Sequence, residues 1–226
     1  MAHNQPLSPD VAACKEGVRL GEDGQFDAAL AELERAVALR PGYPDAHHYR
    51  GAVLEELGRY AEALAAYELA DRQRPGHPPT AFDRGRVLGL MNRHEPAVEA
   101  YRQALEMEPR HLNARVNLGA TLNQLGRYEE ALIELDRSIA LAEEGGYRGG
   151  RRDSRSYAYA ARAAVLVNLG RYDEALTAVD VAISCGPDRS DMYYNRAYIL
   201  RQLGRRREAE QAERLYEDVR SRDTWG

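Results

Sequence analysis

Few residues of this 226-residue chain have the types and spacing that catalysis or metal binding would require. Asp45 and His48 stand three residues apart, which places them on one face of a helix, and His47 lies next to them. A zinc site needs three or four ligands, and no third ligand is evident at a suitable spacing. The patterns of a phosphate-binding loop, a dinucleotide-binding GxGxxG and a GxSxG nucleophile are absent. The sequence therefore predicts no enzyme activity, no bound metal and no cofactor.

The charge and composition exclude several other classes of protein. Lysine plus arginine number 31 and aspartate plus glutamate 36, giving a net charge of −5, whereas nucleic-acid binding needs a positive surface. No apolar run approaches the ~20 residues that cross a bilayer, and Met1–Asp10 lacks the apolar core of a secretory signal. Two distant cysteines, Cys14 and Cys185, form neither a disulfide scaffold nor a CxxC site. We therefore expect a cytoplasmic protein that contacts no membrane, and nucleic acid is not its expected partner.

A repeat of 34 residues organises the chain. Two columns of equivalent residues, with one longer step of 44 residues, are Ala29, Ala63, Ala97, Ala131, Ala175 and Ala209, and Leu20, Leu54, Leu88, Leu122, Leu166 and Leu200. A column of small residues comprises Gly17, Gly51, Gly85, Gly119, Ala163 and Ala197. A column of turn residues comprises Gly24, Gly58, Asn92, Gly126, Gly170 and Gly204.

Each repeat has the features of two helices joined by a tight turn. In the second repeat, Leu54 and Leu57 are followed by Tyr60 and Leu64 at helical spacing. The Gly or Asn between the two apolar runs permits the positive φ of a helix C-cap. A proline such as Pro75 stands just past the second run, where it cannot continue a helix. Because the small-residue column lets two helices approach closely, we expect stacked helical hairpins.

These features make the sequence similar to the tetratricopeptide repeat (TPR) family. The segments GAVLEELGRYAEALAAYELADRQRP and LGATLNQLGRYEEALIELDRSIAL follow the G-x-x-L…G-x-Y-x-x-A pattern of that family, and the resemblance covers residues 10–223. It implies an all-α fold, a right-handed α-solenoid of antiparallel helix pairs. The chain departs from the pattern by lacking the early tryptophan, by having Glu143 in place of a proline, and by having Arg206 and Glu213 where aromatic or apolar residues are usual.

We assign residues 10–223 to one TPR solenoid domain, preceded by an extension at 1–9 and followed by a tail at 224–226. Its six repeats are expected at 10–43, 44–77, 78–111, 112–155, 156–189 and 190–223. Ser8 and Pro9 suit the N-cap and the first position of the first helix. The last helix, from Arg206 to Arg222, is rich in charge and is expected to cap the stack with a polar face.

In the TPR family the first helices of successive repeats line a concave groove that holds a peptide or a partner segment, and the resemblance implies such a groove here. Helical spacing places the second, sixth, ninth and thirteenth residues of each repeat on this face, with some neighbours. The candidate groove residues are Asp45, His48, Tyr49, Glu56, Phe82, Asp83, Arg86, Asn113, Asn117, Asn123, Gln124, Tyr157, Asn168, Tyr194, Asn195, Tyr198 and Arg201.

The candidate groove has an acidic early half and a late half rich in amides and tyrosines. Carboxylates such as Glu55 and Glu56 would favour an Arg or Lys of the ligand. Carboxamides such as Asn117 and Asn195 both donate and accept, so they pair with a peptide backbone whatever its sequence. Tyrosines such as Tyr157 would supply rigid apolar anchors. The alternative is that these amides are simply solvated and that some of the tyrosines pack between helices.

The ten extra residues of the fourth repeat form a second candidate surface. The segment near 143–155 is rich in glycine, and its arginines Arg148, Arg151, Arg152 and Arg155 make it locally basic. One interpretation is a solvated connection after an extended helix, because long surface loops cost little. The other is a loop that orders on an acidic partner.

The sequence thus favours a non-catalytic adaptor that binds a peptide segment or partner protein in the groove. A self-assembling or complex-building scaffold is the alternative, and a regulator that binds RNA or a small molecule is a minor one. The oligomeric state is left open between a monomer and a weak dimer. Arginine supplies nearly all of the positive charge, with Lys15 the single lysine, which indicates a GC-rich bacterial genome.

Overall fold

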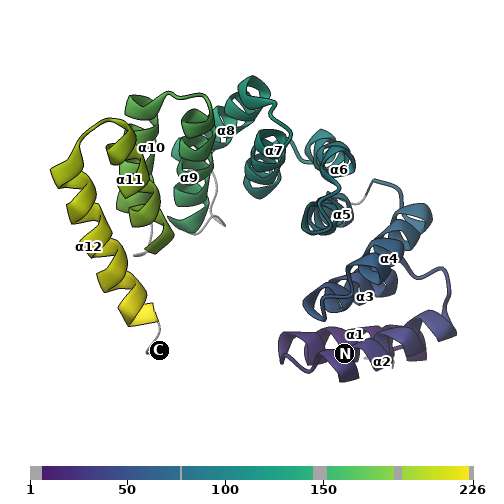
Figure 1. The fold of residues 1–226 in the computed structure, drawn as a ribbon. Helices are drawn as coiled ribbons and strands as arrows, with labels where there is room; N and C mark the ends of the chain where they lie inside the picture. Colours follow the sequence, from purple (N-terminus) through teal and green to yellow (C-terminus); the bar gives the residue numbers. More distant parts are fainter. Residues whose placement is uncertain (1–6, 77, 145–151, 186–189, 224–226) are drawn as a thin grey trace. The chain divides into compact units, whose positions relative to one another are not determined.

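The computed structural model of the chain describes residues 7–76, 78–144, 152–185 and 190–223. The regular elements in these ranges are all α-helices, which confirms the predicted all-α class (Figure 1). No helix within them is long and apolar enough to cross a bilayer.

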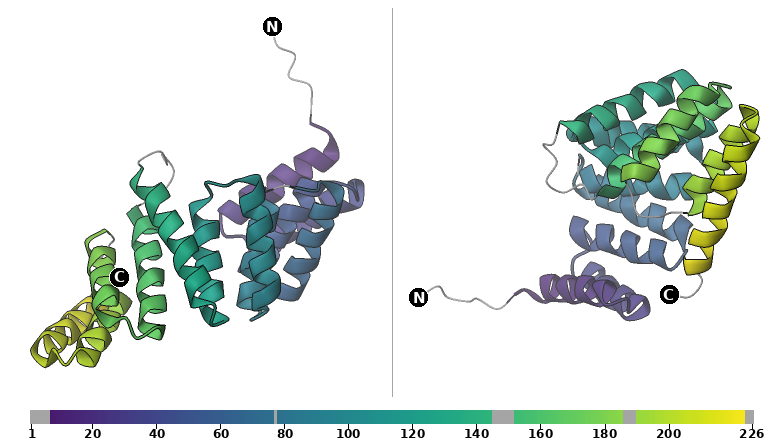
Figure 2. Two further views of the ribbon diagram at one scale, coloured as in Figure 1. Left: turned by 90° about the horizontal axis from the view of Figure 1, so that it is seen from above. Right: turned by 90° about the vertical axis from the view of Figure 1, so that its left-hand side faces the viewer.

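The helices divide into two compact units, Met1–Pro109 and Arg110–Gly226. In each unit, consecutive helices pair as hairpins and adjacent hairpins stack (Figures 1 and 2). Unit 1 contains α1 (Pro9–Glu22), α2 (Phe26–Leu39), α3 (Pro44–Glu56), α4 (Tyr60–Gln73), α5 (Pro78–Leu90) and α6 (His94–Met107). Unit 2 contains α7 (Leu112–Gln124), α8 (Tyr128–Glu143), α9 (Arg152–Asn168), α10 (Tyr172–Cys185), α11 (Ser190–Gln202) and α12 (Arg206–Asp223). The assignment of 10–223 to one domain stays a prediction.

The turn inside each hairpin is set by the predicted Gly or Asn column. All six of its residues have positive φ, between 56° at Asn92 and 75° at Gly24. Just beyond each of these residues the chain closes the turn: the N–H of Arg59, for example, donates to the carbonyl of Leu54 at 2.8 Å. This left-handed step suits glycine, and asparagine is the side chain that tolerates it best.

The small-residue column is the point of closest approach between the two helices of a hairpin. A Cβ added at Gly51 would lie 2.7 Å from the Tyr67 ring, and one at Gly119 would lie 2.6 Å from Leu135 Cγ. Tyr67 and Leu135 are fully buried, so a larger residue in place of either glycine would overpack the hairpin. Because the close approach admits only a small residue at this position of each hairpin, the 34-residue period can be recognised in the sequence.

Within each unit, successive hairpins are joined by a buried apolar layer edged by ion pairs. In unit 2, Ile199 of α11 shares a buried cluster with Leu176 and Val179 of α10. Beside this layer, Arg196 Nε lies 2.7 Å from an oxygen of Asp180. The same arginine position pairs with the preceding hairpin at Arg162–Asp136 (2.7 Å) and Arg50–Glu34 (3.8 Å).

The ends of two elements differ in detail from the sequence expectations. Helix α1 begins at Pro9 after Ser8 as predicted, but the Ser8 hydroxyl makes no capping hydrogen bond. Helix α9 begins at Arg152, so the predicted loop near 143–155 is too long at its C-terminal end. The run Arg152–Arg155 contains no Gly or Pro, and it continues into the apolar period of α9.

Candidate functional site

A stripe of amides and tyrosines follows the first helices of unit 2. We call it the unit 2 stripe, and it comprises Asn113, Asn117, Asn123 and Gln124 on α7, Tyr157 and Asn168 on α9, and Tyr194, Asn195, Tyr198 and Arg201 on α11. All of these side chains are exposed or half-buried. The three tyrosines are 49%, 59% and 44% exposed in chain order.

The stripe results from the helical period of each first helix. On α9, Ala158, Val165 and Leu166 are buried, while Tyr157 and Asn168 lie on the exposed side. Amides of neighbouring first helices meet: Asn168 Nδ2 donates to Asn123 Oδ1 at 2.8 Å. The spacing rule applied to the sequence therefore found a surface that is accessible, although its use as a groove stays a prediction.

The stripe can bind an extended chain without a particular sequence. Each carboxamide offers donors and an acceptor to backbone amides, and each such hydrogen bond contributes roughly 0.5–1.5 kcal/mol net. An exposed tyrosine adds apolar area together with a hydroxyl. The stripe thus combines pairing to a backbone with anchor points for apolar side chains.

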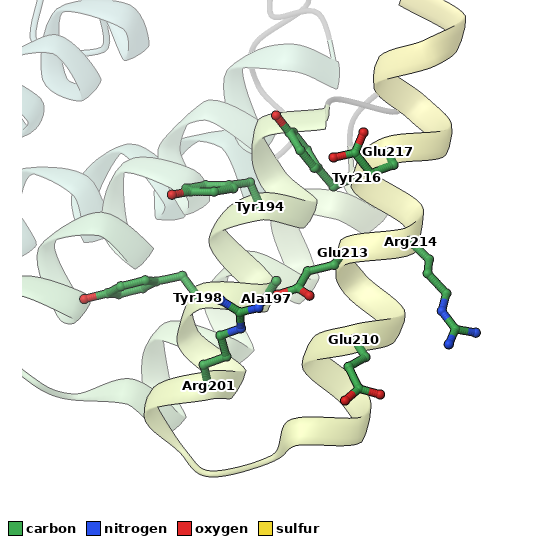
Figure 3. Close-up of a pocket in the computed structure, with 9 residues that line it drawn as sticks. All are labelled: Tyr194, Ala197, Tyr198, Arg201, Glu210, Glu213, Arg214, Tyr216 and Glu217. Carbon is green, nitrogen blue, oxygen red and sulfur yellow. Dashed lines mark ion pairs between the residues drawn. The ribbon is translucent and has the colours of Figure 1, made fainter.

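A cavity of about 690 Å³ lies at the α12 end of the stripe, between α11 and α12 (Figure 3). Tyr194, Tyr198 and Arg201 belong to both the stripe and the cavity wall. Tyr216 of α12 completes an aromatic corner, with its ring centroid 5.7 Å from that of Tyr194. Inside the cavity Arg201 pairs with Glu213 at 2.5 Å. Sequence reasoning missed α12 as part of this surface, because it assigned the groove to first helices alone.

The predicted acidic half of the groove has a different character in unit 1. Glu55 of α3 is 6% exposed, and one of its carboxylate oxygens pairs with Arg86 of α5. Arg86 also reaches Asp83 at 3.1 Å, and His48 Nε2 lies 3.7 Å from the other Asp83 oxygen. Tyr67 donates its hydroxyl to Glu55 at 3.4 Å. We call these five residues the unit 1 charge network.

Burial controls protonation in the unit 1 charge network. Burial, reinforced by the negative charge of Asp83, raises the pKa of Glu55 to about 7 despite the opposing effect of Arg86. Burial also raises the pKa of Tyr67. The carboxylates here are therefore partnered inside the molecule, which leaves them less able to attract a cationic ligand than the sequence suggested.

The other candidates in unit 1 make separate contacts. Asp45 pairs with Arg74, and Phe82 packs near Tyr101. Tyr49 is 39% exposed, and the edge of its ring lies against His48. Glu56 is exposed.

The described residues contain no group of three or more potential metal ligands. Asp45 and His48 make separate contacts, the first with Arg74 and the second with Asp83 and Thr80. His47 is buried, and its Nε2 lies 2.7 Å from the carbonyl oxygen of Pro41.

The predicted arginine loop lies partly outside the described residues. Arg148 and Arg151 lie outside the described residues, while Arg152 and Arg155 belong to α9. Arg155 pairs with Glu143 at 3.4 Å, and the Tyr159 hydroxyl donates to the same Glu143 oxygen at 2.9 Å. These contacts tie the start of α9 to the end of α8.

Comparisons with known proteins agree with this architecture. The family model described as "Tetratricopeptide repeat" matches residues 14–78, 82–145 and 156–223. No curated protein matches the sequence at a significant level.

Several solved structures share the fold at low sequence identity. A tetratricopeptide repeat protein from Parabacteroides merdae is 20% identical, with a TM-score of 0.76 over 92% of this chain and 79% of that one. Pseudomonas aeruginosa pilF is 17% identical, with a TM-score of 0.73 over 95% and 97%. YrrB, described as a TPR protein with an unusual peptide-binding site, is 20% identical, with a TM-score of 0.62 over 83% and 91%.

Proposed function

Because the chain belongs to the tetratricopeptide repeat family, we propose that it is a non-catalytic adaptor that holds an extended segment of another protein against the unit 2 stripe. The observation that carries the proposal is the exposure of Tyr157, Tyr194 and Tyr198 among carboxamides on successive first helices. Exposed rings of this size are a common anchor in protein recognition. The peptide-binding site named for YrrB supports the class of ligand, not its sequence.

The amides set the expected affinity and selectivity. A few backbone hydrogen bonds at roughly 1 kcal/mol each give moderate affinity, because ordering the peptide opposes them. Carboxamides do not distinguish one side chain from another, so selectivity comes from the tyrosines. We place the protein in the bacterial cytoplasm, a reducing compartment that suits its free cysteines Cys14 and Cys185.

The proposal assigns the main binding surface to unit 2. In unit 1, Glu55 and Asp83 already have Arg86 as a partner, so a ligand would have to break those contacts. Glu56 is the exposed exception on α3.

The test uses peptides selected on the full chain from a random displayed library. We expect Tyr157→Ala with Tyr198→Ala to weaken the binding of the selected peptides by about tenfold, equal to ~1.4 kcal/mol. Asn168→Ala with Asn195→Ala removes hydrogen bonds and should weaken binding by a few-fold, at roughly 1 kcal/mol for each bond. Titration calorimetry measures both changes, and circular dichroism verifies that helicity is kept.

Matched controls lie on second helices of the same unit. Ile133 of α8 is 52% exposed and Gln211 of α12 is exposed, so Ile133→Ala and Gln211→Ala remove similar groups outside the stripe. These controls should change affinity by less than about twofold. Equal losses in the control and stripe variants, or a library that yields no binding peptide, would contradict the proposal.

A further inference from the structure

The first and last hairpins of the chain each have a face that interior hairpins bury against a neighbour. Within unit 1 this is the outer face of α1, and within unit 2 it is the face formed by α11 and α12 around the cavity of Figure 3. The rules by which interior hairpins stack can therefore be applied to these two faces.

Two positions define the interior contact. At the four junctions within the units the seventh residue of the repeat is an arginine, and at three of them it pairs with the twenty-fifth residue of the preceding repeat: Arg50–Glu34, Arg162–Asp136 and Arg196–Asp180. At the remaining junction Arg84 pairs with Asp71, the twenty-eighth residue. At the same four junctions the tenth residue is apolar and buried (Val53, Val87, Val165 and Ile199), and it faces the twenty-first and twenty-fourth residues of the preceding repeat. Ile199, for example, clusters with Leu176 and Val179.

The terminal hairpins change all of these positions, and they change them in a complementary way. In α1 the seventh residue is Glu16 and the tenth is Arg19. In α12 the twenty-first, twenty-fourth and twenty-fifth residues are Glu210, Glu213 and Arg214. In the interior register Glu16 would meet Arg214, and Arg19 would meet Glu210 and Glu213. Each meeting joins opposite charges, and the Glu16–Arg214 meeting reverses the signs of the interior arginine–acid pair.

The side chains concerned are available for such a contact. Arg19 and Glu16 are 55% and 46% exposed, and Glu213 is 37% exposed. Arg19 now pairs with Glu16 and with Asp23, each at 2.6 Å, and Glu213 pairs with Arg201. Exposed pairs of this kind exchange at little cost, because each contributes little in water. Glu210 and Arg214 border the cavity and have no ion-pair partner among the described residues (Figure 3).

We propose that copies of this chain stack head to tail, with α1 of one copy seated on the α11–α12 face of the next. The occupant of the cavity is then the first helix of a second copy, placed as a first helix is placed on the preceding hairpin within each unit. Such a contact joins two different surfaces, so it can be repeated from copy to copy. The contact is charged where interior contacts are apolar, so we expect it to be weak and sensitive to salt.

The test measures the mass of the full chain in solution by sedimentation velocity and light scattering. We expect the average mass to rise with protein concentration at about 0.01 M salt, where the Debye length is about 30 Å, and to fall to the monomer at about 1 M, where it is about 3 Å. Arg19→Glu should raise the dissociation constant about tenfold, because like charges then face each other. The double variant Glu210→Arg with Glu213→Arg should do the same from the other side.

The decisive sample is an equal mixture of these two variants. The α1 face that carries Arg19→Glu then meets the arginine-rich α12 face of the other chain, and the two unchanged faces also meet, so association should return. The control is Arg171→Glu, an exposed residue at the start of α10, which should associate like the wild type.

A wild type that stays monomeric at low salt would overturn the proposal, and the two terminal faces would then be only polar caps of the stack. Variants that associate as well as the wild type, or a mixture that does not recover association, would overturn it too. Circular dichroism of each variant verifies folding.

Discussion

The exposed faces of the first helices come from similar repeat positions in the two units but carry different chemistry. In unit 1 the ninth and twelfth positions include Arg86 and Glu55, which pair across α3 and α5. In unit 2 the twelfth and thirteenth positions include Asn123 and Asn168, neutral amides that bond to each other. The contrast teaches that a charge near the apolar layer must be matched from the next repeat, whereas an amide can stay open to a ligand.

Three predictions test this contrast, and the largest concerns pH. Burial raises the pKa of Glu55 from 4.5 to about 7, so the folded state holds this proton more tightly than the unfolded chain. The contribution of protonated Glu55 to the free energy of unfolding is therefore complete below pH 4.5, and it is lost as the pH rises through about 7. Relative to Glu55→Gln, the free energy of unfolding of the wild type should fall by about 3 kcal/mol over this range.

Urea unfolding of both proteins at a series of pH values measures the difference. Comparison with Glu55→Gln removes the titration of the exposed carboxylates that the two proteins share. Asp83, Arg86, Tyr67 and Glu56 are the same in both proteins, so the difference reports on the titration of Glu55. If the free energy of unfolding varied with pH in the same way for both proteins, Glu55 would titrate like an exposed carboxylate, which would contradict the prediction.

The second prediction removes the cation of the unit 1 charge network. Arg86→Ala removes the guanidinium that pairs with Glu55 and Asp83. The change should lower the free energy of unfolding by about 2 kcal/mol above pH 7. The loss should shrink below pH 5, because a protonated Glu55 no longer needs a positive partner.

The matched control for Arg86 is Arg162→Ala in unit 2, which breaks the exposed pair with Asp136. This change should cost less than about 1 kcal/mol. Losses of equal size in the two units, measured by the same urea titration, would mean that the contrast between them is only one of residue type.

The smallest prediction concerns a feature that the units share. Asn92 in unit 1 and Gly126 in unit 2 occupy the same turn, at φ of 56° and 72°. Asn92→Gly and Gly126→Asn should each change the free energy of unfolding by less than about 0.5 kcal/mol, while Gly126→Val should cost about 1–2 kcal/mol. Thermal unfolding separates these outcomes, and a large effect of either exchange would show that the turns are not equivalent.

The sequence was informative wherever geometry allows few residue types. Only a glycine fits where Gly51 meets the Tyr67 ring, and only glycine or asparagine suits the turn at Asn92. The hairpins and their period could therefore be predicted, and the exposed amides and tyrosines of unit 2 followed from the same period.

The unit 1 charge network could not be predicted in the same way. The twelfth position holds Gly21, Glu55, Gly89, Asn123, Val167 and Arg201, so the column has no common chemistry. The burial of Glu55 depends on Arg86 and Tyr67, which come from two other helices. The start of α9 was missed for a related reason, since its arginines resembled a solvated loop and their contacts with α8 cannot be seen in a linear chain.

The close contact within each hairpin bears on how such a protein can evolve. Gly51 and Gly85 face tyrosine rings, Gly119 faces Leu135, and Ala163 occupies the same position in a hairpin whose second helix carries Val179. The size of one residue is thus matched to that of its companion across the turn. Exchange of a single helix between repeats would separate these matched partners, so recombination is expected to transfer whole hairpins, with each pair inherited together.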